Sequence, residues 1–183
     1  IESLGKKRWY QTAITDTKDG LIMIALDGWS GYMYISRDGG EVWEENISLE
    51  ELWWWGEPGA ISFSNDGQDI FIAPDDGYIY KSSDYGKTWY PLTESGIKTW
   101  VAITSSSDGQ KVVAIADEDY IYNSIDGGQT WVEQTNVPMV SWQTVASSAS
   151  GEYIYAAAYD GTPIYKYSNA LPQAKNVSAV VTR

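Results

Sequence analysis

Carboxylate side chains recur at matching places in four short segments of the chain. If the segments meet, their oxygens form an acidic ring that could coordinate Ca²⁺, accept hydrogen bonds from sugar hydroxyls or attract a basic protein. Asp76, Asp117, Asp119 and Asp160 are therefore candidate ligand-binding residues. An Asp before a Gly also makes tight turns, and a solvated charged loop also explains residues 117–119. The segments are Asp27-Gly28-Trp29-Ser30-Gly31, Pro74-Asp75-Asp76-Gly77, Asp117-Glu118-Asp119 and Asp160-Gly161-Thr162.

Tryptophans that the rest of the chain does not repeat form a second candidate set. Trp53 and Trp54 lie in the long connection Glu44–Trp55, and Trp29 lies in the first acidic segment. Exposed Trp rings stack on sugar rings or anchor protein interfaces. Trp29, Trp53 and Trp54 are therefore predicted to extend the acidic surface into a binding platform. The alternative is that these rings pack locally beneath the inserted loop.

Paired carboxylates also raise the question of glycoside hydrolysis. A glycosidase needs two carboxyl groups about 5 to 10 Å apart across a cleft, and Asp76, Asp117 and Asp119 lie in consecutive acidic segments. The chain has no His and no Cys, which excludes His-based triads, thiol nucleophiles, disulfides and Cys/His zinc sites. Since no residue is singled out as acid or base, we assign no catalytic residue and expect a binding protein; an enzyme would be a glycoside hydrolase.

Charge and hydropathy narrow the range of partners. The 183 residues have a formal net charge of -13 with only 12 Lys and Arg residues, which argues against nucleic acid. A carbohydrate or protein partner is expected, with Ca²⁺ as the one cofactor that the acidic segments would suit. No apolar run approaches about 18 residues, so no membrane span is predicted. The first residue is Ile, which indicates a processed chain, a trimmed one or a piece of a longer protein.

The elements that position these residues follow from an eight-residue pattern, Ser-x-Asp-x-Gly-x-Thr-Trp, called here the Ser-Asp-Gly-Trp motif. It predicts a hairpin tip in which Gly supplies a positive φ, Ser and Asp accept hydrogen bonds from loop N–H groups, and the Trp ring packs under the loop. We therefore expect a structural role for each copy. The copies begin at Ser36, Ser82 and Ser124; Val42 replaces Thr in the first, and the pattern is lost at Tyr167-Ser168-Asn169-Ala170.

The motif resembles the Asp-box of the BNR/sialidase-type β-propellers. That resemblance implies a propeller whose motifs lie on the blade periphery, away from the ligand site. It also implies an extracellular or cell-surface location, because relatives include receptor ectodomains and secreted adhesins. Sialidases hold a carboxylate with three arginines, and this chain offers Arg8, Arg37 and Arg183, of which Arg37 lies inside a motif. Sialidase activity is therefore not expected.

The repeat length supports the same fold class. Trp9, Trp55, Trp100 and Trp142 begin four repeats spaced by 46, 45 and 42 residues, the length of one four-stranded propeller blade. We predict an all-β chain, a β-propeller of four-stranded antiparallel blades, with four blades here that stand alone or form part of a larger propeller. Residues 1–183 are expected to form one domain or fragment, with blades at approximately 9–54, 55–99, 100–141 and 142–183.

The fourth repeat lacks an evident outer strand. Residues 176–182, a return of residues 1–7, or continuing chain could supply it, and open blade edges would allow oligomerisation. The leading interpretation is a non-catalytic extracellular binding or adhesion module that recognises carbohydrate or protein through its acidic, Trp-bearing loops. A glycoside hydrolase propeller, or a fragment of one, is the first alternative. A structural subunit or spacer of a surface appendage is the second.

Overall fold

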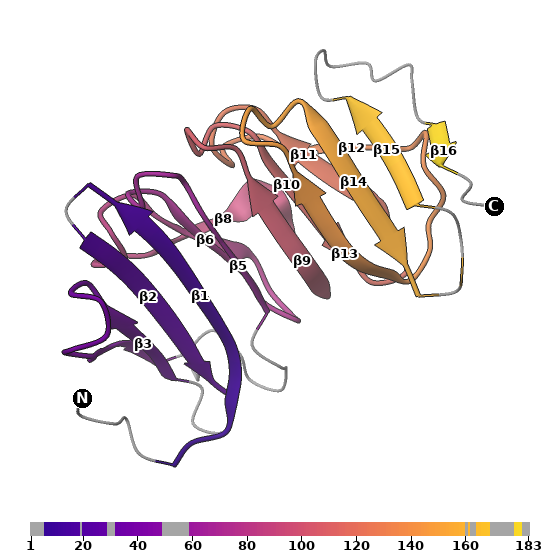
Figure 1. The fold of residues 1–183 in the computed structure, drawn as a ribbon. Coiled ribbons are helices and arrows are strands. Elements are labelled where there is room, and N and C mark those ends of the chain that lie inside the picture. The colour runs from indigo at the N-terminus through magenta and orange to yellow at the C-terminus, as the bar shows by residue number, and fades with distance from the viewer. Residues whose placement is uncertain are drawn as a thin grey trace.

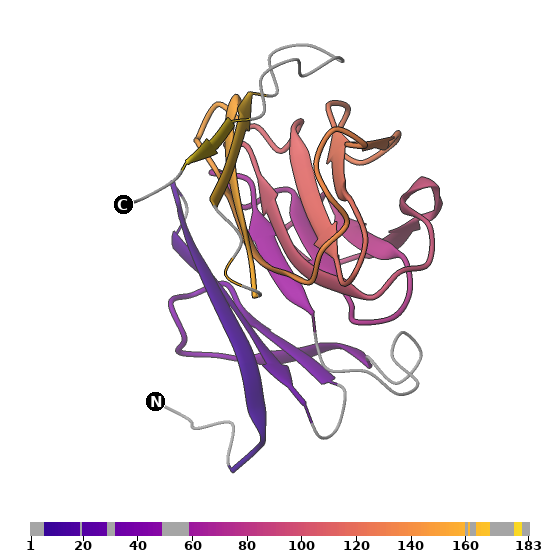
Figure 2. The same cartoon turned by 90° about the vertical axis from the view of Figure 1, so that its right-hand side faces the viewer.

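A computed structural model describes residues 6–18, 20–28, 32–48, 59–159, 161, 164–168 and 178–180. Within them the chain forms four antiparallel sheets of four strands each, so the all-β prediction is confirmed. In every sheet the strands are paired in chain order. The sheets follow one another in an arc, with the first and fourth sheets at its two ends (Figures 1 and 2).

The strands of the four sheets have these bounds. The first sheet holds β1 (Trp9–Thr17), β2 (Gly20–Asp27), β3 (Tyr32–Ser36) and β4 (Glu44–Ser48), and the second holds β5 (Ala60–Phe63), β6 (Ile70–Ala73), β7 (Ile79–Ser82) and β8 (Tyr90–Leu92). The third holds β9 (Trp100–Ser105), β10 (Val112–Ala116), β11 (Ile121–Ser124) and β12 (Val132–Glu133). The fourth holds β13 (Trp142–Ser147), β14 (Tyr153–Ala158), β15 (Ile164–Ser168) and β16 (Ser178–Val180).

The outer strand of the fourth sheet comes from the C-terminal part of the chain. β16 pairs with β15 through Ile164 opposite Val180 and Lys166 opposite Ser178. Of the three sources that the sequence left open, residues 176–182 are therefore the one that the structure uses.

A short 3₁₀ turn, Thr93–Ser95, follows β8.

The hydrophobic core of the described residues lies between consecutive sheets. In β6, Ile70 and Ile72 pack toward the first sheet, whereas Phe71 and Ala73 pack toward the third. Successive side chains of a strand point to opposite faces, and both faces of a middle sheet are covered. This explains why β6 and β10 are continuous apolar runs whose side chains are all buried.

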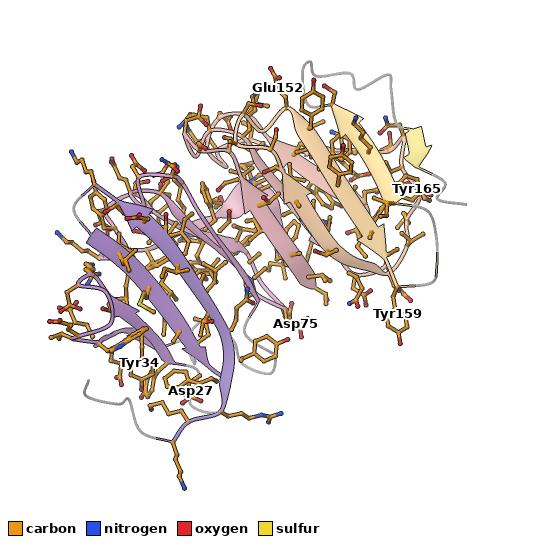
Figure 3. All side chains as sticks on the ribbon, in the orientation of Figure 1. Asp27, Tyr34, Asp75, Glu152, Tyr159 and Tyr165 are labelled. Atoms are coloured by element: carbon orange, nitrogen blue, oxygen red, sulfur yellow. The ribbon has the colours of Figure 1, made fainter. Side chains whose placement is uncertain are left out.

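The first strands of the sheets, β1, β5, β9 and β13, lie next to one another along the inside of the arc. Hydroxyl groups join three of them: Ser62 Oγ of β5 lies 2.8 Å from Ser105 Oγ of β9, and Thr104 Oγ1 of β9 lies 2.9 Å from Ser147 Oγ of β13. The loops between second and third strands therefore gather at one edge of the fold, called here the loop face. Asp27, Asp75 and Tyr159 mark this edge, and Glu152 marks the opposite one (Figure 3).

Candidate functional site

The Ser-Asp-Gly-Trp motifs form closed hairpin tips, as predicted. In the second copy, Asp84 accepts hydrogen bonds from the backbone N–H groups of Lys87 and Thr88 at 3.0 and 2.9 Å and from Thr88 Oγ1 at 2.6 Å. Ser82 Oγ accepts from the Gly86 N–H at 2.9 Å, and Trp89 Nε1 donates to the Gly86 carbonyl at 3.3 Å. These polar groups satisfy the loop itself, which supports the structural role of the motif.

The same contacts shift the acidity of the motif carboxylates. Burial alone would raise the pKa of Asp84, but the hydrogen bonds from Thr88, Ser82 and Lys87 outweigh it and lower the pKa to about 2. In the first copy the Val42 N–H contributes most to lowering the pKa of Asp38. Because Val42 has no hydroxyl, the first copy lacks the second, side-chain hydrogen bond that Thr88 gives Asp84.

The degenerate fourth copy replaces a hydrogen-bonding Ser with an aromatic ring. Tyr167 pairs with Ile154, as Ser124 pairs with Val112 in the third sheet, so Tyr167 occupies the position of the motif Ser. The ring is fully buried between the third and fourth sheets, and its hydroxyl donates to Asn123 Oδ1 at 2.8 Å. Burial raises the pKa of Tyr167 well above its ordinary value.

A cavity of about 320 Å³ opens on the loop face between the second, third and fourth sheets. Two carboxylates, the Gln143 amide, two small hydroxyl side chains and the Tyr159 ring contribute to its lining. Gln143 comes from β13, whereas the other polar residues precede or follow strands. Acidic and aromatic groups from different sheets therefore share one cavity. The lining residues are Asp75, Thr99, Val101, Asp117, Ser141, Trp142, Gln143 and Tyr159.

The backbone places Asp117 and Tyr159 at equivalent positions. The Asp117 N–H donates to the Thr99 carbonyl, and the Tyr159 N–H donates to the Ser141 carbonyl, both at 2.9 Å. Each residue thus follows the second strand of its sheet directly and is fixed to the start of the first strand. Tyr159 is 80% exposed and projects away from the ribbon (Figure 3). The scaffold repeats while the side chain at this position changes, as expected of a recognition surface on a rigid fold.

The structure treats the predicted acidic residues differently. Asp117, which is exposed, lines the cavity. Asp76 is also exposed and is not among the lining residues, whereas its neighbour Asp75 is. The sequence analysis missed Asp75, Gln143 and Tyr159 as site residues. Tyr159 could have been found from its position directly after the second strand of its sheet, which is the position of Asp117; Asp75 lies two residues after β6 and Gln143 lies within β13, so no such signal marks them.

Asp119 lies outside the cavity lining and is engaged in structural contacts. Its Oδ2 atom is 2.9 Å from Lys98 Nζ, and its Oδ1 atom accepts from the Tyr122 hydroxyl at 2.9 Å and the Tyr120 N–H at 2.8 Å. Burial alone would raise the pKa of Asp119, but the hydrogen bonds from these three residues lower it. Burial also raises the pKa of Tyr122 to about 12. The Asp119 carboxylate is therefore satisfied by the protein.

Four of the predicted site residues, Trp29, Trp53, Trp54 and Asp160, lie outside the described residues. Their assignment stays a prediction. Within the described part of the chain, no group of three or more Asp and Glu side chains is arranged to hold a metal ion. The same part of the chain contains no helix that is long and apolar enough to be a membrane span.

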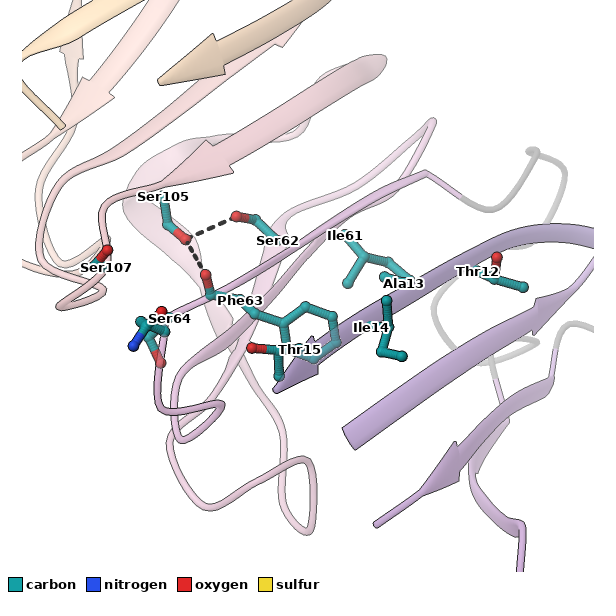
Figure 4. A pocket seen from close by; sticks show the side chains of 11 residues that line it. Thr12, Ala13, Ile14, Thr15, Ile61, Ser62, Phe63, Ser64, Ser105 and Ser107 are labelled. Atoms are coloured by element: carbon teal, nitrogen blue, oxygen red, sulfur yellow. Dashed lines mark hydrogen bonds between the residues drawn. The ribbon is translucent and has the colours of Figure 1, made fainter. Parts of the chain in front are cut away.

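A second cavity, of about 480 Å³, lies at the other end of the inner strands, between β1, β5 and β9 (Figure 4). Three of its hydroxyl groups, those of Ser62, Ser64 and Ser105, bond within the protein: Ser105 Oγ contacts Ser62 Oγ at 2.8 Å and donates to the Phe63 carbonyl at 3.0 Å. Ser64 Oγ likewise donates to Asp66 at 2.6 Å. We therefore take the loop-face cavity as the candidate site.

Comparison with known proteins bears on the fold. A GH74 enzyme from Niastella koreensis superposes with a TM-score of 0.70 at 17% identity, over 92% of this chain and 30% of the enzyme. YCF48 from Cyanidioschyzon merolae superposes with a TM-score of 0.67 at 18% identity, over 100% of this chain and 59% of YCF48. A YCF48 bound to D1 peptide superposes with a TM-score of 0.59 at 18% identity, over 96% of this chain and 60% of that protein. The chain has a β-propeller fold. Its sheets are propeller blades, and they span 30% to 60% of these relatives.

No known family matches the chain by sequence, and no curated protein matches it. The relatives share less than a fifth of their residues with it, so the likeness establishes the fold alone. Function has to be argued from the site on the loop face.

Proposed function

We propose that this chain is a non-catalytic, extracellular or cell-surface binding module whose ligand lies over the loop-face cavity. The observation that carries the proposal is that Asp75 and Asp117, from consecutive blades, line the same cavity as Gln143 and the exposed Tyr159. We also propose that the chain belongs with the Asp-box propellers, on the strength of its three motif copies. Because the motif carboxylates form hydrogen bonds within their own loops, we place ligand recognition on the loop face.

Carbohydrate is the ligand class that we favour. Carboxylates accept hydrogen bonds from sugar hydroxyls, the Gln143 amide both donates and accepts, and the Tyr159 ring offers a flat surface for a sugar ring. Trp29, Trp53 and Trp54 are proposed to extend this surface. Ca²⁺ is retained as a test condition, because Asp75 and Asp117 supply oxygen ligands but too few to hold the ion alone.

Two alternatives each have a specific observation in their favour. A basic peptide suits the net charge of -13, and one of the structural relatives is a YCF48 bound to a D1 peptide. Glycoside hydrolysis is suggested by two carboxylates in one cavity and by the GH74 relatives. In that case Asp75 and Asp117 would be the acid and base candidates.

One experiment separates these functions. Purified chain is incubated with immobilised polysaccharides and glycans and with basic peptides, with and without Ca²⁺, while retained protein and released reducing ends are read from the same wells. Retention on a glycan without release is expected. Release would replace the proposal with the hydrolase, and retention on peptides alone would replace it with peptide binding. If the assay shows neither retention nor release, the proposal is overturned and a structural spacer is favoured.

Variants then connect binding to the cavity. Asp117→Asn and Asp75→Asn are expected to weaken glycan retention at least about tenfold, because each removes a charged hydrogen-bond acceptor worth about 1.5 to 3 kcal/mol. Asp76→Asn is the matched control, since it removes the neighbouring exposed carboxylate. Trp53→Ala with Trp54→Ala tests the proposed aromatic extension. Equal affinity of Asp117→Asn and the parent chain would contradict the assignment of the site.

A further inference from the structure

The loop-face cavity contains two carboxylates and no cationic side chain. Asp75 is half-buried and Asp117 is exposed, and the other lining residues are neutral. None of the ion pairs found among the described residues includes either of these carboxylates. A ligand that covers the cavity therefore meets two negative charges that the described part of the chain does not balance.

The lysine that precedes the lining residue Thr99 is already bound within the fold. The Nζ atom of this residue, Lys98, lies 2.9 Å from Asp119 Oδ2 and 4.4 Å from the centre of the Tyr122 ring. Its positive charge is therefore held between a carboxylate and an aromatic ring, neither of which lines the cavity. Lys98 shows the surroundings that this fold gives to an amine, and it leaves the two cavity carboxylates unbalanced.

Tyr159 gives the cavity an aromatic ring as well. The residue is 80% exposed, and among the described residues no Lys or Arg side chain lies over its ring. A cation within about 6 Å of a ring centre is attracted by the negative face of the ring. The exposure does not come from the place of Tyr159 in the fourth blade, because Asp117, at the equivalent position of an interior blade, is exposed too. Two carboxylates and an exposed aromatic ring therefore line one cavity.

The charge of a ligand decides how well it suits this lining. A bound ligand removes water from the carboxylates, and a buried charge is costly unless it is paired and hydrogen-bonded. A neutral sugar offers hydroxyl donors but no positive charge, and an anionic sugar is repelled by a chain with a net charge of -13. A protonated amine offers N–H donors together with the missing charge, and such charge-assisted hydrogen bonds are about twice as strong as neutral ones. An amine therefore balances Asp75 and Asp117 best.

We propose that the glycan bound at the loop-face cavity carries protonated amino groups, as sugars with free amines do. This inference rests on the proposed function and names the class of carbohydrate. An amine of the glycan donates to the carboxylate of Asp75 or Asp117, beside the Tyr159 ring. The Gln143 amide and the Ser141 hydroxyl, which line the same cavity, bind the neutral hydroxyl groups of the sugar.

The test compares two forms of one polysaccharide. The intact chain is titrated onto an immobilised polymer of β-1,4-linked glucosamine with free amines, and onto the same polymer after N-acetylation. Acetylation removes the positive charge and keeps the sugar backbone. The parent chain is expected to bind the free-amine form at least about tenfold more tightly than the acetylated form.

Variants separate the cavity from the overall charge of the chain. Asp75→Asn and Asp117→Asn are each expected to remove most of the preference for the free-amine form, and Tyr159→Leu is expected to remove part of it. Glu152→Gln is the matched control, because it removes one negative charge from an exposed side chain at the opposite edge of the fold (Figure 3) and should keep the preference. Cooperative unfolding shows which variants are folded, and the two Asp variants test the cavity independently of each other.

Three results would overturn the inference. The first is equal binding of the two polymers by the parent chain; if Asp117→Asn still weakens that binding, the proposed glycan-binding function stands while the amine requirement falls. The second is an equal loss of the preference in Glu152→Gln and Asp117→Asn, which would indicate attraction by net charge alone. The third is binding of neither polymer, in which case retention on another glycan would keep the proposed function and retention on basic peptides alone would overturn that function too.

Discussion

The indole Nε1 of Trp142 donates a 2.9 Å hydrogen bond to the carbonyl oxygen of Asp119 and so joins the fourth blade to a loop of the third. Trp100 makes the same bond to Gly77 at 3.0 Å, one blade earlier. A repeated Trp thus fixes the third and fourth blades to the loop face of their predecessors. The loops that carry the candidate site are held in place by the next blade as well as by their own.

Trp142→Phe should show how much this hydrogen bond and the packing of the indole ring stabilise the fold. The substitution removes the hydrogen bond, leaves the Asp119 carbonyl without this donor and leaves space beside a side chain that is 1% exposed. We expect a loss of about 2 to 4 kcal/mol in the free energy of unfolding, measured by urea titration. Trp9→Phe, at the exposed equivalent position, should cost clearly less, and an equal cost would contradict the account.

Exchanging Thr and Val between two motif copies should remove a stabilising hydrogen bond from one copy and add one to the other. Thr88→Val removes the 2.6 Å bond from Thr88 Oγ1 to Asp84 and gives the second copy the composition of the first. We expect a loss of about 1 kcal/mol in the free energy of unfolding. The reciprocal Val42→Thr supplies a hydroxyl beside Asp38 and should stabilise the chain. Thermal and urea unfolding of the two variants would show shifts of opposite sign.

Much of this fold can be predicted from the sequence, because the repeat is local. Each Ser-Asp-Gly-Trp motif satisfies its own backbone groups, so Asp84 and Thr88 report a hairpin without knowledge of any other blade. The site is harder. Asp75 and Asp76 lie in the bend between β6 and β7, where no strand alternation indicates which side chain faces the cavity, so the sequence does not separate the cavity-lining Asp75 from the exposed Asp76. The pairing of Asp119 with Lys98 joins residues 21 positions apart through inter-strand geometry.

Acid should weaken the motif contribution in a defined pH window. The folded pKa of Asp84 is about 2, below its ordinary value of 3.8, so the carboxylate binds its proton less readily in the folded chain. Its contribution is therefore complete above about pH 4 and is lost as the pH falls toward 2. The difference in unfolding free energy between the parent chain and Asp84→Asn should shrink over that range. A difference that does not change with pH would contradict the assignment.

Asp117 and Asp119, two of the three carboxylates of the segment 117–119, should have different roles. Asp119→Asn weakens the contacts to Lys98 Nζ and the Tyr122 hydroxyl, both at 2.9 Å, and is expected to cost about 1 kcal/mol, a value reduced for the partial exposure of the pair. Because the Asp119 side chain lies outside the cavity lining, glycan retention by the folded variant should be unchanged.

Asp117→Asn should give the opposite result, with weaker retention and little change in the free energy of unfolding, because Asp117 lines the cavity and the substitution keeps its backbone N–H bond to the Thr99 carbonyl. Both variants are compared in the same urea titration and the same retention assay. The pair distinguishes a binding loss from a folding loss, since one substitution alone could lower retention through either route. Retention lost in Asp119→Asn at full stability would move the site toward that carboxylate.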